Sequence, residues 1–148
     1  MRKSLTISDT LIKYGPWAVI LGVLHAVLVS IVYNIVPDAY MDEIFHIGQT
    51  RRYCQGNYTW DPMITTPPGL YILALPLFCG RERYVNSVLF PLVFLACCRL
   101  RSVFSHSFIG FTSLIVVCLP VLLHSSILFY TDLLSLFLTI STMMVVLY

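Results

Sequence analysis

Long apolar runs alternate with one polar stretch along this chain. The first run, residues 15–36, contains no Asp, Glu, Lys or Arg. As an α-helix it would be about 33 Å long, which is enough to cross the hydrocarbon core of a bilayer once. We therefore predict a first membrane span over residues 15–36, preceded by a short tail of residues 1–14.

The second half of the chain predicts three more membrane segments. Residues 84–101 form the second span, and residues 104–123 form the third. A tight turn over residues 124–131 then leads into a fourth apolar run, residues 132–148. That run is shorter than the roughly 20 residues that a crossing helix needs. We therefore expect an incomplete fourth span, and an N-terminal piece of a larger polytopic bundle.

Residues 70–79 are apolar but too short to cross a bilayer. Ten helical residues extend only about 15 Å. Pro67 and Pro68 precede the segment and Pro76 interrupts it, and proline disfavours a continuous helix. We predict a juxtamembrane helix over about residues 69–79, lying on the membrane surface within a long polar loop of residues 37–83.

The positions of the basic residues predict the topology. Basic residues favour the cytosolic side, and they flank the predicted spans at Arg2, Lys3, Lys13, Arg99 and Arg101. This pattern predicts that residues 1–14 are cytosolic and that residues 37–83 and 124–131 face the lumen. Asp42, Glu43 and Asp132 would then share one side of the membrane. If residues 70–79 were a full span, Asp132 would instead face the cytosol.

The composition agrees with a membrane protein. Of the 148 residues, 58% are hydrophobic and only 11% are charged, and the mean hydropathy is +0.85. Soluble domains carry about a quarter charged residues. The formal net charge of +2 is too small to indicate a nucleic-acid partner.

The five cysteines do not have zinc-site spacing. Three of them lie in apolar runs, where a small buried side chain is the simpler interpretation. Cys54 and Cys79 fall in the polar loop and could form a disulfide if that loop faces an oxidising lumen.

The candidate chemistry lies in the polar stretch of residues 38–71, which holds four of the seven acidic residues. Asp42 and Glu43 come just after the first span. A carboxylate at a membrane surface is a candidate general base, because partial desolvation raises its pKa towards neutrality. The alternative is a structural role, because acidic residues stabilise the first turn of a helix. If residues 42–53 are helical, Asp42 and His46 share one face.

Other polar residues allow more than one interpretation. Arg51 and Arg52 could bind a phosphate or could be ordinary solvated arginines. Asp42 and His46 have ligand-like spacing, but two ligands do not make a metal site, so we predict no metal. Asn57 begins the sequon Asn-Tyr-Thr and is a possible glycosylation site. Tyr130, Thr131 and Asp132 form a second polar cluster near the bilayer edge.

Two long motifs resemble one known family. The segment MDEIFHIGQTRRYCQGNYTWDPMITTPPGLY (residues 41–71) is similar to the first luminal loop of the dolichyl-phosphate-glucose-dependent α-1,2-glucosyltransferases. LPVLLHSSILFYTD (residues 119–132) is similar to a later segment of the same family, and RYVN (residues 83–86) is a weaker third match. The motifs occur in the family's order. Members have several hundred residues and roughly a dozen spans, so most of their scaffold has no counterpart here.

The resemblance implies an all-α, polytopic GT-C-type glycosyltransferase of the endoplasmic reticulum membrane with a luminal active site. Such an enzyme moves glucose from dolichyl phosphate glucose onto the lipid-linked oligosaccharide used for asparagine-linked glycosylation. The β-linked glucosyl phosphate becomes an α-1,2 glucoside, so the anomeric centre inverts in one displacement. Its partners are the bilayer, the polyprenyl-phosphate sugar donor and the oligosaccharide acceptor, and no cofactor is expected.

On this basis the predicted catalytic residues are Asp42, as base or acceptor orienter, and Glu43. A phosphate leaving group needs little protonation, so one carboxylate suffices. Eight further residues are predicted to bind substrate: His46, Arg51, Arg52, Asp61, Thr65, Thr66, Tyr130 and Asp132.

Two rival interpretations come from other classes. A small multi-span adaptor without catalytic activity would show the same apolar runs. A transporter would place its polar groups at mid-membrane, whereas the acidic residues here cluster at a predicted interface.

Overall fold

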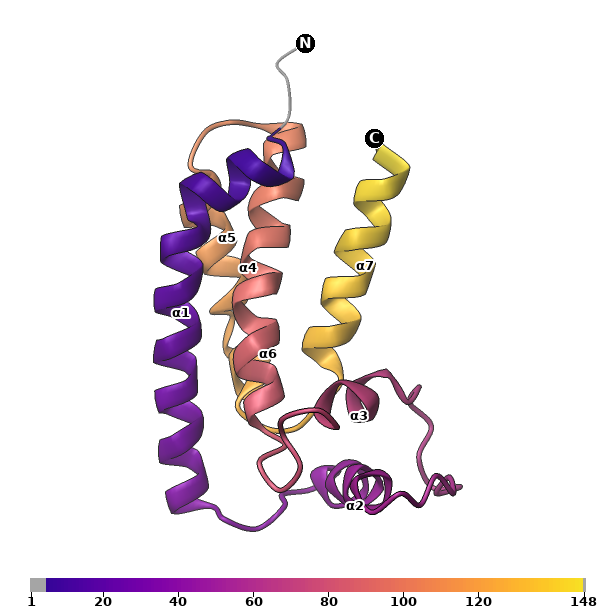
Figure 1. Cartoon of the computed structure of the whole chain (residues 1–148). Coiled ribbons are helices and arrows are strands. Elements are labelled where there is room, and N and C mark those ends of the chain that lie inside the picture. The colour runs from indigo at the N-terminus through magenta and orange to yellow at the C-terminus, as the bar shows by residue number, and fades with distance from the viewer. Residues whose placement is uncertain (1–4, 148) are drawn as a thin grey trace.

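The computed structural model describes residues 5–147, and Arg2, Lys3 and Tyr148 lie outside them. Over these residues the chain forms helices and no strand, which confirms the all-α prediction (Figure 1). The helices are α1 (Ile7–Ile35), α2 (Glu43–Cys54), α3 (Gly69–Ala74), α4 (Tyr84–Phe104), α5 (Ile109–Val117), α6 (Pro120–Ser126) and α7 (Asp132–Leu147).

Helix α4 is the centre of the bundle, and α1, α5 and α7 pack around it. The contact with α1 is close, since a Cβ added at Gly22 would lie 3.2 Å from Cγ of Pro91. Inside the bundle His25 forms hydrogen bonds with Ser87 of α4 through Nδ1 (3.0 Å) and with Ser126 of α6 through Nε2 (2.9 Å). Buried polar groups in an apolar bundle need such partners, so this contact ties three helices together.

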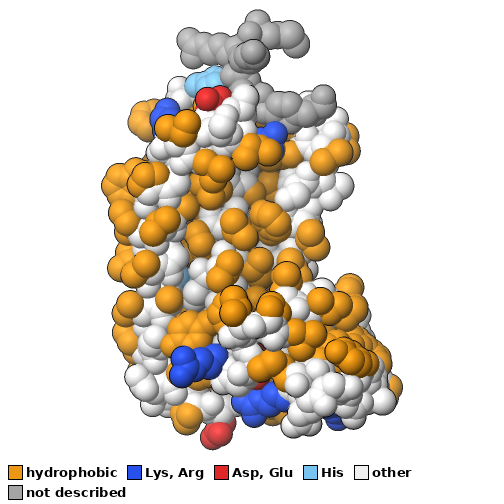
Figure 2. Space-filling model, in the orientation of Figure 1, with side chains coloured by type: hydrophobic (Ala, Val, Ile, Leu, Met, Phe, Trp, Pro, Cys, Tyr) orange, Lys and Arg blue, Asp and Glu red, His pale blue; other side chains and the backbone are white. Residues whose placement is uncertain are grey.

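The outer surface of the bundle suits a bilayer. On the face shown in Figure 2, hydrophobic side chains cover the sides, and the Lys and Arg side chains gather near the two ends. Among the described residues, α1 and α4 are long and apolar enough to span a membrane, and the bent pair α5–α6 would make a third span if counted as one. Helix α7 is apolar but has only 16 residues.

Helix α1 begins earlier than the predicted span. It starts at Ile7, because Thr6 and Asp9 form a capping box: the Thr6 side chain accepts from the Asp9 N–H, and the Asp9 carboxylate accepts from the Thr6 N–H. Pro16 lies inside the helix, and its first turns bend away from the remaining axis (Figure 1). Proline causes such bends because it removes one backbone hydrogen bond.

The predicted third span is not one continuous helix. Phe104 is the last residue of α4, and the rest of the predicted span holds α5 and the start of α6, whose axes differ by 64°. Pro120 occupies the first turn of α6, and Leu119 before it has an extended ψ of 133°. A residue that precedes proline disfavours the helical region, so the chain breaks there. Helix α6 then continues to Ser126, which shortens the predicted turn of residues 124–131 at its start.

The polar loop lies across one end of the bundle. Helices α2 and α3 sit at the end where α1 finishes and α4 and α7 begin (Figure 1). Helix α3 has six residues, fewer than the predicted 69–79, and it does not cross the bundle. Asp42 and Asp132 therefore lie at the same end of the molecule. This is the arrangement expected if residues 70–79 do not cross the membrane.

Candidate active site

Glu43 and Arg83 form a buried ion pair at the centre of the polar end. Arg83 donates to both carboxylate oxygens of Glu43, from Nε at 2.9 Å and from NH2 at 2.7 Å. Both side chains are fully buried. The hydrogen bond to Glu43 raises the pKa of Arg83 above its usual value, so the guanidinium stays charged. Such a pair is costly to break, because either partner alone would leave a buried charge.

The ion pair joins segments that are distant in the sequence. Glu43 also accepts the backbone N–H groups of Phe129 (2.6 Å) and Tyr40 (3.0 Å). Arg83 donates to the carbonyl oxygens of Val36 (2.7 Å) and Asp38 (2.9 Å). The pair therefore fastens the start of α2 to the end of α1, to α4 and to the turn before α7. With four donors on its two oxygens, the Glu43 carboxylate is saturated.

The carboxylate of Asp42, the residue before Glu43, is neither buried nor saturated with hydrogen bonds. Asp42 is the N-cap residue of α2 and is exposed, with no side-chain capping bond. Within residues 5–147 no hydrogen bond or ion pair engages its carboxylate. Asp132 is also exposed, at the start of α7. Both carboxylates act electrostatically on His46, so the two predicted polar clusters lie near the same side chain, and of the adjacent acids Asp42 and Glu43 only Asp42 is accessible to a ligand.

Aromatic side chains contact His46, the side chain on which both acids act. The ring of His46 lies between Tyr71, at a centroid distance of 5.8 Å, and Tyr130, at 6.1 Å. Burial lowers the pKa of His46, and the nearby carboxylates of Asp42, Glu43 and Asp132 oppose that effect. The Tyr130 hydroxyl donates to the Tyr40 carbonyl at 3.3 Å, and burial raises the Tyr130 pKa. His46 and Tyr130 are therefore neutral hydrogen-bonding groups beside exposed carboxylates.

His46 is also held by a hydrogen-bond chain from α3. Its Nδ1 lies 2.7 Å from the hydroxyl of Tyr71, and that hydroxyl lies 2.9 Å from Oγ1 of Thr66. Tyr71 is fully buried, and burial raises its pKa. Thr65, the neighbour of Thr66, is exposed.

Ion pairs and hydrogen bonds hold the C-terminal end of α2 against the neighbouring loop residues. Arg51 Nε lies 3.2 Å from Oε1 of Glu82, and Arg52 lies 3.3 Å from Asp61. Gln49, which is buried, donates to the Thr59 carbonyl and accepts the Asp61 N–H. These contacts hold the loop after α2 against the helix.

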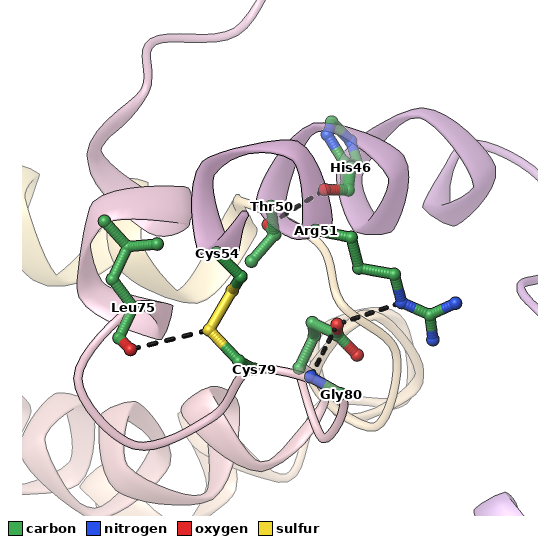
Figure 3. The surroundings of a disulfide bond; sticks show 8 residues. His46, Thr50, Arg51, Cys54, Leu75, Cys79 and Gly80 are labelled. Carbon is green, nitrogen blue, oxygen red and sulfur yellow. Dashed lines mark hydrogen bonds and ion pairs between the residues drawn. A yellow bond between two sulfur atoms is a disulfide. The ribbon is translucent and has the colours of Figure 1, made fainter. Parts of the chain in front are cut away.

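A disulfide also holds this end of α2, and it joins the two cysteines that the sequence marked as a possible pair. Cys54 and Cys79 are bonded, with Cα atoms 6.0 Å apart. Figure 3 shows the bond beside Arg51 and Gly80, which joins the last turn of α2 to the chain after α3. Asn57 of the sequon is exposed in the loop between them, and its Oδ1 accepts from Thr59.

The structure divides the predicted residues into two groups. Asp42, His46, Tyr130 and Asp132 gather around one surface, with Thr66 behind His46. Arg51, Arg52, Asp61 and Asn57 lie towards the C-terminal end of α2. Nine residues separate Asp42 from Arg51, which is about 13 Å along a helix. The two arginines are therefore remote from the exposed acids.

Two residues essential to this geometry were missed in the sequence. Arg83 stands in the weak RYVN match, and its partner Glu43 is 40 positions away. Tyr71 lies in the apolar segment predicted as a juxtamembrane helix. A signal existed for Tyr71, since it ends the longest motif beside the Thr-Thr pair.

Comparison with known proteins identifies the family. A model of the DIE2/ALG10 family matches residues 36–148. Three relatives carry the name Dol-P-Glc:Glc(2)Man(9)GlcNAc(2)-PP-Dol alpha-1,2-glucosyltransferase. That of Candida glabrata is 40% identical over 116 residues, covering 67% of this chain and 21% of the relative. That of Homo sapiens is 31% identical over 137 residues, covering 75% and 29%. That of Arabidopsis thaliana is 67% identical over 46 residues, covering 30% and 9%.

No solved structure matches this chain. The chain spans between 9% and 29% of the length of these three relatives. The family match includes the exposed acids, the buried ion pair and the disulfide, and it confirms the resemblance seen in the motifs. This chain belongs to the DIE2/ALG10 family.

Proposed function

We propose that this chain provides the first catalytic loop of a glucosyltransferase that uses dolichyl phosphate glucose and extends the lipid-linked oligosaccharide in α-1,2 linkage. The observation that carries the proposal is that an exposed carboxylate, Asp42, and a second exposed acid, Asp132, both act on His46, whose ring contacts Tyr130. The names of the relatives supply the donor and acceptor.

In this mechanism Asp42 is the general base. The 2-hydroxyl of the accepting sugar attacks the anomeric carbon of the donor glucose, and its proton passes to the Asp42 carboxylate. The new C–O bond forms as the bond to the phosphate oxygen breaks, and dolichyl phosphate leaves with the electron pair. Attack opposite the leaving group inverts the anomeric centre. A positioned base typically contributes about 10²–10⁴-fold.

Glu43 is a positioning residue in this scheme. Its carboxylate is buried and already accepts four hydrogen bonds, so it has no lone pair directed at a substrate. It fixes the start of α2 and with it the neighbouring Asp42. Fixed orientation of reacting groups contributes much of an enzyme's rate enhancement.

Asp132 and Tyr130 lie where they can bind sugar hydroxyls at the reaction centre. Arg51 and Arg52 are about 13 Å further along α2 and are paired with acids. They therefore suit remote parts of a long oligosaccharide better than the phosphate at the anomeric carbon. Asp61, the partner of Arg52, belongs to the same remote part of the loop, whereas Thr65 is exposed beside Thr66. The absence of a metal from the reaction stays a prediction.

We place the loop in the lumen of the endoplasmic reticulum and the N-terminus in the cytosol. Disulfides persist in oxidising compartments and are rare in the cytosol, and the Cys54–Cys79 bond lies in this loop. The pathway named by the relatives supports the same location. The names of the relatives favour an enzyme over the adaptor interpretation.

The proposal is tested in a full-length family transferase in which residues 36–148 of this chain replace the corresponding segment; we refer to it as the grafted transferase. Asp42→Asn keeps the size of the side chain but removes the base. We expect transfer to fall about 10²–10⁴-fold, with the acceptor lacking its final glucose accumulating in cells. Lipid-linked oligosaccharide profiling measures this.

Asp38→Asn is the matched control, because Asp38 is exposed four residues earlier and only its backbone carbonyl is used. It should leave transfer unchanged. Near-normal turnover by Asp42→Asn would remove Asp42 from the mechanism. An inactive grafted transferase without any substitution would contradict the proposed role of the whole segment.

A further inference from the structure

The chain of hydrogen bonds behind His46 has one favoured direction. A phenol is a better donor than an imidazole N–H, and an imidazole nitrogen is a better acceptor than a phenol oxygen. The 2.7 Å contact is therefore a bond from the Tyr71 hydroxyl to Nδ1 of His46. Thr66 then donates to the Tyr71 oxygen across 2.9 Å. Bonds in such a chain strengthen one another.

This direction determines the tautomer of His46. When Nδ1 accepts, the proton of the neutral ring is on Nε2. The carboxylates of Asp42, Glu43 and Asp132 all act on the ring. Within residues 5–147, Nε2 has no hydrogen-bond partner. The ring itself is held by Tyr71 and Tyr130.

We propose that His46, held as the Nε2–H tautomer by Tyr71 and Thr66, donates a hydrogen bond to the 3-hydroxyl of the accepting sugar. This inference rests on the proposed function. Asp42 and His46 lie one helical turn apart on the same face of α2. One is an acceptor and the other a donor, which matches two neighbouring hydroxyls of a pyranose.

The pair also explains why the 2-hydroxyl would be chosen. The carboxylate of Asp42 takes the proton of the hydroxyl that attacks. The neighbouring 3-hydroxyl accepts from His46 and fixes the rotation of the sugar ring in the site. A site that bonds a substrate hydroxyl discriminates strongly against an analogue that lacks it, because its own polar group is then unpaired.

The test compares two short lipid-linked acceptor analogues, one complete and one lacking the 3-hydroxyl. The grafted transferase should prefer the complete acceptor by about tenfold in kcat/KM, the size expected for one unpaired buried donor. In His46→Ala this preference should fall to about one. Because both acceptors meet the same folded protein, the ratio does not depend on how much of the variant folds.

Tyr71→Phe tests the hydrogen-bond chain itself. It leaves the ring and removes the donor to Nδ1, so the preference should fall by severalfold. Tyr53→Phe is the matched control, since its ring packs 6.4 Å from Tyr71 without bonding His46, and it should keep the full preference.

Three results would overturn the inference: equal use of both acceptors by the grafted transferase, a preference retained in His46→Ala, or a preference unchanged by Tyr71→Phe. Each leaves the role of Asp42 intact. Full activity of Asp42→Asn on both acceptors would instead overturn the proposed function.

Discussion

The two ends of α2 both carry ion pairs, and the pairs differ in burial. At the N-terminal end, the side chains of Glu43 and Arg83 are each 0% exposed. At the C-terminal end the arginines are far more exposed: Arg51 is 60% exposed while its partner Glu82 is 1% exposed, and Arg52 is 46% exposed while Asp61 is 22% exposed. Water and salt weaken exposed pairs, whereas a buried charge depends entirely on its partner.

The two kinds of ion pair therefore have different roles: one positions Asp42, and the other holds the outer loop. The buried pair fixes α2 against three other segments and leaves the adjacent Asp42 unpaired at a defined place. The two pairs at the C-terminal end, each with an exposed arginine, hold the outer loop, and a covalent bond between Cys54 and Cys79 reinforces them. The catalytic proposal therefore depends on the first end, and the order of the outer loop depends mainly on the disulfide.

The largest expected effect on stability comes from breaking the buried pair. Glu43→Gln in the grafted transferase leaves Arg83 charged and buried without a counter-ion, so we expect a loss of about 3–5 kcal/mol. Thermal unfolding in detergent measures it. Arg52→Gln, at the exposed end, is the matched control and should cost at most about 1 kcal/mol. Equal losses in the two variants would contradict the comparison.

The second effect comes from the disulfide at the other end. Replacing Cys54 and Cys79 together by serine opens a loop with a sequence separation of 25, and we expect a loss of about 3 kcal/mol. This double-serine variant should also migrate at the same rate on reducing and non-reducing gels. Cys118→Ser, which removes an exposed free cysteine, should change neither property. A double-serine variant as stable as the parent would show that the ion pairs of Arg51 and Arg52 hold the outer loop without the disulfide.

The sequence was informative where the signal is local. Runs without charges predicted α1, α4 and α7, and the length of residues 70–79 predicted a short helix, which the structure has as the six-residue α3. The capping box of Thr6 and Asp9 and the proline at position 120 were also visible in the sequence. The capping box starts α1 at Ile7, eight residues before the predicted span, and Pro120 breaks the predicted third span.

The sequence could not reveal relations that exist only in three dimensions. Asp42 and Glu43 are adjacent acids of similar chemistry, and nothing local distinguishes the exposed one from the buried one. The distinction comes from Arg83 and the Phe129 N–H, 40 and 86 positions away from Glu43. The role of Tyr71 likewise depends on His46, 25 positions earlier.

The central claim is that both acidic clusters face one non-cytosolic compartment. It is tested most directly by Asp42→Cys and Asp132→Cys, each in a chain carrying Cys118→Ser, since Cys97 and Cys98 are buried. A membrane-impermeant maleimide is added to sealed microsomes before and after the membrane is opened. We predict that both positions react only after opening. Reaction of the two positions from opposite sides would contradict the account.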